Sequence, residues 1–263
     1  MASVWVYPVK SCRGFTVEGV RFGARGPEGD RRFAVVDAGG RFVSQRSMPR
    51  MTRIRPRPLA GGGVRLEAEG AAPFEVRPER GWPPLEVAVW NDRLRAVDCG
   101  AAAARWLSEF LERPVRLAWL PDDGPRVRPD GSLRPAAFAD AEPVLVITES
   151  SLAELEREAG RPVGAERFRP NVVVGGVPAW EEDAWRRIRV GWAVLEIVKP
   201  CARCPIVAVD PETGRRDPAA LRALGRIRRW DGEVWFGQNA RVVAAGEVRA
   251  GDRVEILETA AGG

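Results

Sequence analysis

Apolar and polar residues alternate along most of the chain, and this period of two predicts a fold built mainly from β-strands. Tight turns are expected where Gly39-Gly40 and Asn91-Asp92 separate two alternating runs. In the first part of the chain the pattern predicts strands at residues 3–9, 14–22, 32–37, 40–45, 64–69, 85–90 and 93–99.

A helix and a long loop end this first part. The run "AAAARWLSEFLE", residues 101–112, places its aromatic and leucine residues on one helical face. Residues 121–135 are rich in Pro, Asp and Arg and show no period, so they predict a linker or a long binding loop. We therefore expect two domains, residues 1–120 and residues 121–263.

The second part alternates in the same way, with two helices between its strands. Ser151 and Glu154 have the spacing of a capping box, and Gly160 is a stop signal, so a helix is expected over 151–160. Strands are expected at residues 143–148, 171–176, 186–191, 193–200 and 205–210, and within 240–257.

A second, shorter helix is predicted where Asp217 and Pro218 occupy the N-cap and first helical positions, and Gly225 is expected to end it. The short strands with a Gly-rich turn near the end of the chain are typical of strands that close a barrel. The whole pattern predicts a mostly β, α+β fold.

Composition agrees with a globular protein. The chain has 263 residues, of which 45% are hydrophobic and 29% charged. No stretch approaches the ~20 apolar residues of a membrane span. The start, "MASVWVYPVKS", lacks the basic and apolar regions of a signal peptide. We therefore expect a soluble cytoplasmic protein with no membrane partner.

The absence of histidine excludes many enzyme classes. Ser-His-Asp triads, Cys-His pairs, HExxH zinc sites and facial-triad iron sites all require it. The four cysteines, Cys12, Cys99, Cys201 and Cys204, are too few for a disulfide scaffold and are expected to be thiols. Chemistry must come from other side chains or from a bound cofactor.

The net charge is +5, and only two of the 41 basic residues are lysine. Codon usage in a GC-rich genome explains most of this bias. The exceptions are informative because lysine is a compact point charge, whereas arginine is a broad planar fork. Lys10 lies in "YPVKSCRG" and Lys199 in "KPCARCP".

Arginine clusters at 53–57 and 226–229 raise the question of nucleic-acid binding. The positive excess is modest, and aromatic residues do not alternate with these arginines as they do in a stacking platform. We therefore do not favour a nucleic-acid partner.

The string "VKPCARCPIVAVDPETG" carries the strongest local signal, a Cys-x-x-Cys motif. β-type residues flank it and Pro205 follows directly, which disfavours a thioredoxin-like site. A zinc site would have to recruit Cys12 and Cys99, or carboxylates. Two interpretations remain. The motif holds either two ordinary buried thiols or one reactive thiolate, favoured by Lys199 and Arg203, that acts as nucleophile, sulfur carrier or soft-metal ligand.

Two further strings offer groups for an anion or a heterocycle. In "RFRPN", Arg169 and Asn171 alternate and so face one side of an extended chain. Arginine can bind a phosphate or carboxylate, and asparagine can pair with a ring edge. In "YPVKSCRG" and "GDRRF", the donors include Lys10, Ser11 and Arg31. Seen alone, each string is better explained by ordinary turn and surface residues.

Six strings in this order resemble the MOSC family, named for the C-terminal domain of molybdenum-cofactor sulfurase, with its usual N-terminal β-barrel partner. They are "YPVKSCRG", "DRRFAVVD", "FADAEPVLVITESSL", "RFRPNVVVGG", "KPCARCPIVAVDPETG" and "FGQNARVV". The resemblance runs from Val4 to Leu257 and is greatest to the branch of amidoxime reducing components. It implies an N-terminal β-barrel-like domain followed by a MOSC β-barrel domain with a few short helices.

The resemblance also implies a molybdenum cofactor, a phosphorylated pterin whose dithiolene chelates molybdenum. The family's sulfur ligand to the metal maps to Cys204, which is thereby the implied catalytic residue. The implied cofactor contacts map to Lys10, Ser11, Arg31, Asp140, Arg169, Asn171, Ala202, Arg203 and Asn239. Ala202 and Asn239 depart from the polar or aromatic residues of relatives.

By the same resemblance, the protein is expected to be an oxidoreductase that reduces small N-hydroxylated substrates such as amidoximes and hydroxylamines. No further cysteines follow for a [2Fe–2S] cluster, which some bacterial relatives carry in an added domain, so electrons are expected from a separate flavoprotein, ferredoxin or cytochrome. The alternative is a carrier that delivers the cofactor, or sulfur as a persulfide on Cys204, without turnover of its own.

Overall fold

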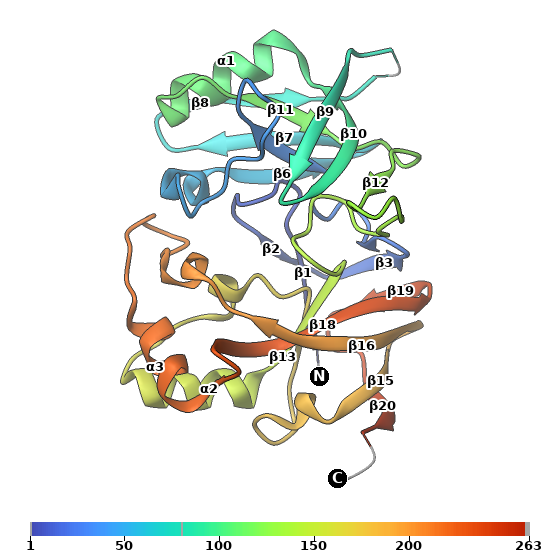
Figure 1. Cartoon of the computed structure of the whole chain (residues 1–263), viewed down its shortest axis with the longest axis vertical. Coiled ribbons are helices and arrows are strands. Elements are labelled where there is room, and N and C mark those ends of the chain that lie inside the picture. The colour runs from blue at the N-terminus through green and yellow to red at the C-terminus, as the bar shows by residue number, and fades with distance from the viewer. Residues whose placement is uncertain (1, 80, 261–263) are drawn as a thin grey trace.

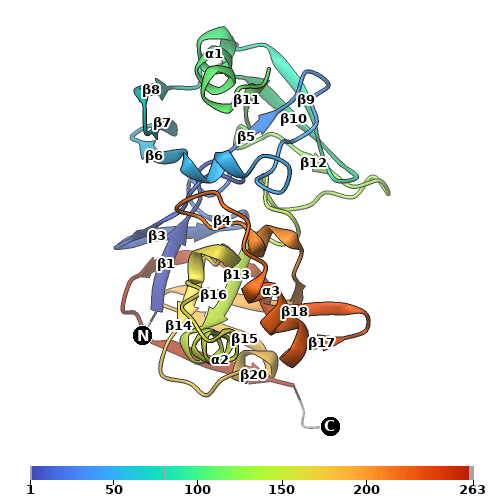
Figure 2. The ribbon, with the colours of Figure 1, turned by 90° about the vertical axis from the view of Figure 1, so that its left-hand side faces the viewer.

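The computed structural model describes residues 2–79 and 81–260 and shows two halves stacked along the long axis of the molecule (Figure 1). The upper half in this view contains one α-helix and several short strands. The lower half contains the largest sheet, two α-helices and both ends of the chain (Figure 2). The prediction of a mostly β, α+β fold is confirmed.

A nine-stranded sheet forms the centre of the lower half. Its order is β2-β1-β14-β13-β18-β16-β15-β20, with β17 paired to β18. The strands are β1 (Ala2–Val6), β2 (Phe15–Val17), β13 (Val144–Thr148), β14 (Val172–Val174), β15 (Trp185–Val190), β16 (Ala193–Ala202), β17 (Arg229–Trp230), β18 (Glu233–Ala244) and β20 (Val254–Thr259). β13 and β14 run parallel, because α2 (Glu149–Ala159) and η2 (Ala165–Phe168) carry the chain back between them.

Side chains on β13 alternate between two cores, one on each face of this sheet. Val144 and Val146 pack into one hydrophobic cluster, whereas Leu145 and Ile147 pack into the other. The second cluster also contains residues of α2 and of α3 (Ala219–Ile227), which contact each other there (Figure 2). Because β13 is buried on both faces, its residues form a continuous apolar run rather than an alternating one.

The upper half contains two smaller sheets and α1 (Gly100–Leu111) around two further cores. One sheet has the order β12-β10-β11-β5 with β9 on β10, and the other has the order β6-β7-β8. Their strands are β5 (Phe33–Val36), β6 (Arg55–Leu59), β7 (Gly63–Ala68), β8 (Ala71–Val76), β9 (Pro84–Val89), β10 (Asp92–Asp98), β11 (Arg116–Trp119) and β12 (Arg126–Val127). On β5, Phe33 and Val35 face one core, and Ala34 and Val36 face the other.

The first strands of the chain belong to the lower half. β1 pairs antiparallel with β14, and Val4 lies opposite Val172. A third small sheet, β19-β3-β4, comprises β3 (Gly19–Gly23), β4 (Gly26–Pro27) and β19 (Gly246–Arg249). The chain therefore starts in the lower half, builds the upper half and returns (Figure 1). The division into residues 1–120 and 121–263 stays a prediction.

The helix α2 lies where expected, but the predicted capping box of Ser151 and Glu154 is wrong. The N-cap is Thr148, which is extended at the end of β13 and accepts a hydrogen bond from the Ser151 amide at 3.2 Å. Gly160 ends the helix with φ 69°, as predicted.

The helix α3 is displaced from its predicted ends. Its N-cap is Pro218 rather than Asp217, whose carboxylate accepts a hydrogen bond from the Ala219 amide at 3.1 Å. The helix also continues past Gly225, because the neighbouring Leu224 is fully buried in the core and packing outweighs the weak helix propensity of glycine.

Residues 205–210 do not form the predicted strand. They contain η4 (Pro205–Ala208), a 3-10 turn in which the Val207 amide donates to the Cys204 carbonyl at 3.3 Å. Pro205 has no amide hydrogen to offer a sheet and a fixed φ that suits the first position of a helical turn.

The expected strand at 40–45 is also wrong. This segment makes only isolated bridges, because the Asp37 carboxylate accepts hydrogen bonds from the amides of Gly39 and Arg41 and holds them in a turn. The turn between β9 and β10 consists of Trp90 and Asn91, one residue earlier than expected.

Two short turns complete the described elements, η1 (Pro49–Arg53) and η3 (Glu181–Asp183). Within the residues that the structure describes, none of the helices combines the length and the apolar character needed to cross a membrane.

Candidate functional site

A cavity of about 300 Å³ lies where segments distant in sequence meet at one edge of the nine-stranded sheet. Its wall contains all ten residues that the resemblance implies for metal or cofactor binding. They are Lys10, Ser11, Arg31, Asp140, Arg169, Asn171, Ala202, Arg203, Cys204 and Asn239.

Neighbouring strands of the sheet bring these residues together. Lys10 and Ser11 follow β1, Asn171 directly precedes β14, and Cys204 follows β16. Asn239 lies on β18, opposite Leu145 of β13. Because β1, β14, β13, β18 and β16 are adjacent in this order, their ends converge on one place.

Three residues of the cavity wall have a left-handed backbone, which is rare for residues other than glycine. They are Ser11 with φ 65°, Arg31 with φ 46° and Arg169 with φ 58°. Each such conformation costs about 1–3 kcal/mol, and these conformations concentrate at functional sites. These three lie at the cavity, whereas the other described non-glycine residues with positive φ, Trp90, Glu112, Trp180 and Asp231, lie outside it.

The cysteines occupy three different environments. Cys204 is half-buried at the cavity, and it is not part of a hydrophobic cluster. Cys201 also reaches the cavity wall but packs against the core under α2 and α3. Cys12 and Cys99 are buried in the upper half, where burial raises the pKa of Cys12 to about 12. The zinc site that would recruit them is therefore contradicted, and Cys204 is the thiol least committed to packing.

Arg31 is held by three partners. Its Nη1 donates to Asp30 Oδ2 at 2.5 Å and to Asn171 Oδ1 at 3.2 Å, and its Nη2 donates to the Arg169 carbonyl at 3.0 Å. Burial lowers the pKa of this guanidinium, but the ion pair with Asp30 raises it above the ordinary value, so the charge is retained. Asn171 Oδ1 also accepts a hydrogen bond from the Leu145 amide at 3.2 Å and so orients Arg31.

Arg169 is a half-buried cation that forms no ion pair with any described carboxylate. Its Nη1 donates to the Cys12 carbonyl at 2.7 Å and to Gln45 Oε1 at 3.5 Å. Its Nη2 is buried and has no acceptor within the described ranges. Burial and then the charge of Arg31 lower the pKa of this guanidinium. This nitrogen is therefore available to donate a hydrogen bond to a ligand in the cavity.

Arg203 shows the same feature on the other side of the cavity. Its Nε donates to the Phe236 carbonyl at 2.9 Å, and its Nη1 donates to the Phe168 carbonyl at 3.2 Å. Its Nη2 is buried and, in the part of the chain described, has no acceptor. Two separate guanidinium groups therefore leave donors open at one cavity.

Lys10 and Asp140 form an ion pair at the cavity wall. The Lys10 ammonium donates to the Phe138 carbonyl at 2.8 Å and to Asp140 Oδ1 at 2.5 Å. Burial lowers the pKa of Lys10 to about 8 in spite of this carboxylate. Burial also raises the pKa of Asp140, but Lys10 and the Trp90 indole, 2.9 Å away, bring it well below its ordinary range.

The two residues that depart from the family pattern lie on neighbouring strands. Ala202 of β16 is exposed and offers only a methyl group. Asn239 of β18 is buried and donates from Nδ2 to the Pro200 carbonyl at 3.2 Å. This part of the wall therefore contributes little polarity beyond one carboxamide oxygen.

Ten more residues line the cavity that the resemblance did not assign. They are Ala139, Ala141, Glu142, Leu145, Phe168, Lys199, Pro200, Cys201, Ile206 and Trp235. Lys199 brings the second of the two lysines to the same cavity as Lys10. The period of two could not have placed Trp235 with Asn239, because β18 has a register shift between Trp235 and Gln238.

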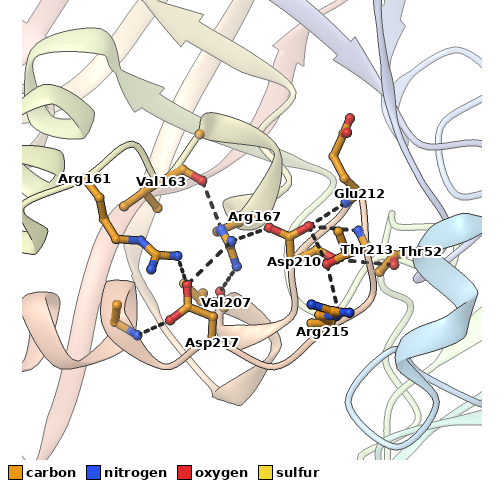
Figure 3. A network of polar contacts seen from close by, with 12 residues as sticks. Thr52, Arg161, Val163, Arg167, Val207, Asp210, Glu212, Thr213, Arg215 and Asp217 are labelled. Carbon is orange, nitrogen blue, oxygen red and sulfur yellow. Dashed lines mark hydrogen bonds and ion pairs between the residues drawn. The ribbon is translucent and has the colours of Figure 1, made fainter.

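A second polar network, centred on Arg167, fixes the segment that follows Cys204 (Figure 3). Arg167 is 5% exposed; its Nε donates to the Val163 carbonyl at 3.0 Å, and its Nη2 donates to Asp210 Oδ2 at 2.6 Å. The network joins the segment that carries Arg169 to the segment that follows Cys204. It therefore fixes two parts of the cavity wall relative to each other.

Comparisons with known proteins identify the family. Residues 1–114 match the MOSC N-terminal beta barrel domain, and residues 134–255 match the MOSC domain. The chain is 32% identical to mitochondrial amidoxime-reducing component 1 from Mus musculus and to that from Homo sapiens, in both cases over 98% of this chain and 82% of the relative. It is 30% identical to molybdenum cofactor sulfurase from Bos taurus over 90% of this chain and 29% of that protein.

Among solved structures, the YUAD protein from Bacillus subtilis has a TM-score of 0.45 and 12% identity, over 97% of this chain and 94% of that chain. This likeness is too low to carry an argument. The two domain matches and the similarity to relatives along nearly the whole chain carry the assignment. The chain belongs to the MOSC-domain family, with an N-terminal MOSC β-barrel domain ahead of its MOSC domain.

Proposed function

We propose that this protein binds a molybdenum cofactor and reduces N-hydroxylated substrates such as amidoximes and hydroxylamines. The observation that carries the proposal is a half-buried thiol, Cys204, in one cavity with buried guanidinium donors of Arg169 and Arg203 that lack acceptors among the described residues. A soft metal that arrives with an anionic organic ligand satisfies both features. The similarity to amidoxime-reducing components supports the substrate class.

The donor set of the cavity fits such a cofactor. Cys204 would supply a sulfur ligand to the metal, and Arg169 and Arg203 would donate to the phosphate or to the pterin. The remaining residues that we expect to contact the cofactor are Lys10, Ser11, Arg31, Asp140, Asn171, Ala202 and Asn239. Lys10 offers a compact donor, which suits a single phosphate oxygen better than a planar fork does.

The conversion of an amidoxime to an amidine takes up two electrons and two protons and releases water. When bound, the cofactor supplies the redox chemistry. The chain binds and orients the reactants in a cavity whose cations, Lys10, Arg31, Arg169, Lys199 and Arg203, outnumber its two acids, Asp140 and Glu142. A separate flavoprotein, ferredoxin or cytochrome would deliver the electrons.

The test uses protein purified from a host that makes the cofactor. We expect near-stoichiometric molybdenum by elemental analysis, and conversion of benzamidoxime to benzamidine with an artificial reductant. Full molybdenum occupancy without product would remove the activity, and protein without molybdenum would remove the cofactor.

The similarity to molybdenum cofactor sulfurase favours a second candidate function. In it, the same cavity would carry the cofactor, or a persulfide on Cys204, for delivery to another enzyme. Transfer to a cofactor-free acceptor enzyme, with no turnover of benzamidoxime, would select this second function over the first.

A further inference from the structure

We propose that Tyr7 is a positioning residue that presents Arg31 and Arg169 as a pair to an oxyanion in the cavity. The centroid of its ring lies 4.6 Å from Arg31 Cζ and 4.3 Å from Arg169 Cζ, within cation–π distance of both. Tyr7 is fully buried and does not line the cavity, so it acts through the two arginines. The inference rests on the proposed function, which supplies the anionic ligand.

The two guanidinium groups need such a neighbour because they are like charges in one wall. Arg31 has the Asp30 carboxylate at 2.5 Å, whereas among the described residues Arg169 donates hydrogen bonds only to the Cys12 backbone carbonyl and the Gln45 side-chain amide oxygen. A second carboxylate would offset the charge of Arg169 and would also repel an incoming anion. The negative face of an aromatic ring attracts the cation without adding net charge to the cavity.

The chain fixes the Tyr7 ring from several sides. The Tyr7 amide donates to Asp30 Oδ1 at 2.8 Å, and the Tyr7 carbonyl accepts from the Arg31 amide at 2.7 Å. Trp5 stacks on the ring at 6.4 Å, and a Cβ at Gly14 would lie 2.1 Å from the ring atom Cε1. The Tyr7 hydroxyl is buried and has no hydrogen-bond partner among the described residues, so the ring rather than the hydroxyl makes the contacts.

The first experiment uses the fact that Tyr7 is the only tyrosine in the chain. Full-length protein with ring-¹³C tyrosine gives one NMR probe, which we titrate with inorganic phosphate. We expect a saturable shift of the ring resonances in the wild type and no shift in Arg169→Met. Phosphate binding that leaves the ring resonances unmoved, or no phosphate binding by the wild type, would overturn the inference.

The second experiment compares three variants by calorimetric titration with phosphate. Tyr7→Leu removes the ring and should weaken binding about tenfold, because two cation–π contacts are lost. Tyr7→Phe keeps the ring and should bind as the wild type does. Phe15→Leu is the matched control, since the Phe15 ring lies 5.1 Å from Arg57 Cζ outside this cavity, and it should also bind as the wild type does.

The outcomes separate the role of Tyr7 from the proposed function. Wild-type affinity in Tyr7→Leu, or an equal loss in Tyr7→Phe, would overturn the role of Tyr7. Molybdenum content of the wild type, measured in parallel, tests the cofactor alone. If Tyr7→Leu does not fold, the wild-type NMR titration and Tyr7→Phe still decide the inference.

Discussion

Arg167 and Arg169 are separated by one residue, Arg167 is buried and Arg169 half-buried, and their hydrogen-bonding surroundings are opposite. Arg167 donates to the Asp210 carboxylate at 2.6 Å and to the carbonyls of Val163 and Val207 (Figure 3). Arg169 has no ion-pair partner among the described residues and leaves Nη2 without an acceptor. The chain itself supplies acceptors to the guanidinium of Arg167, whereas one nitrogen of the Arg169 guanidinium has no acceptor among the described residues.

The difference is the one expected between a structural arginine and an arginine that binds the proposed cofactor. A buried charge is costly unless it is paired and hydrogen-bonded. A guanidinium cannot avoid this cost by losing its proton. Arg169 therefore keeps a donor available for the anion of the proposed cofactor, whereas the hydrogen bonds of Arg167 support the cavity wall.

The largest expected effect on stability comes from removing Arg167 from its hydrogen-bond network with Asp210. Arg167→Met should lower the free energy of unfolding by about 3 kcal/mol, because Asp210 Oδ2 and two carbonyls lose their donor while Asp210 Oδ1 keeps its other hydrogen bonds. Arg169→Met should change the free energy of unfolding little, because Arg169 has no ion-pair partner among the described residues and leaves Nη2 without an acceptor. Urea denaturation measures both variants. Equal losses of stability in the two variants would contradict the comparison.

The next prediction concerns Lys10, a buried cation that, unlike arginine, can lose its proton. Burial lowers the pKa of Lys10 to about 8, below its value in the unfolded chain of about 10.4. Between these values the unfolded state binds more protons, so the wild-type free energy of unfolding should rise with pH relative to Lys10→Met, by about 3 kcal/mol. Urea denaturation from pH 7 to pH 10.5 measures the two slopes. Parallel slopes would show that Lys10 does not titrate in this window.

A smaller effect tests the two thiols at the cavity. Cys204→Ser should lower molybdenum content about tenfold, since the arginine contacts to the organic part of the cofactor remain. Cys201→Ser should keep most of the metal, because Cys201 packs against the core under α2 and α3. Elemental analysis of both variants, purified alongside the wild type, decides the point. A similar loss from both would indicate a Cys-x-x-Cys site instead.

The sequence predicted the cavity wall better than the elements around it. Local motifs place Lys10, Arg169 and Cys204 beside particular strands, and the resemblance implied that these residues share one site. The period of two likewise identified strands with strong alternation, such as β9 and β10. These features depend on neighbours within a few residues.

Features that depend on distant partners were not predictable in this way. β6 contains two prolines and β11 is only four residues long, so neither shows the pattern of a strand, and pairing with a neighbour defines each of them. The left-handed backbone of Arg31 and the contact of the Tyr7 ring with Arg169 likewise arise only when residues far apart in sequence meet.

The smallest effect comes from Glu182, a buried acid that is the counterpart of Arg169. Its Oε2 accepts hydrogen bonds from the hydroxyls of Ser151 at 2.9 Å and Thr148 at 3.0 Å, and Oε1 has no partner in the described ranges. Burial raises the pKa of this carboxyl, which can become neutral by binding a proton and so needs no ligand.

Glu182→Gln should therefore raise the free energy of unfolding by about 1 kcal/mol at pH 7, and the gain should shrink as the pH falls toward 4. The sign follows because the unfolded wild type loses its proton at a lower pH than the folded state does, so its stability falls as the pH rises through that range. Urea denaturation of both proteins between pH 4 and pH 8 measures the difference. A gain that stays constant across this range would come from packing, and the contrast between an acid that can be neutralised and an arginine that cannot would lose its support.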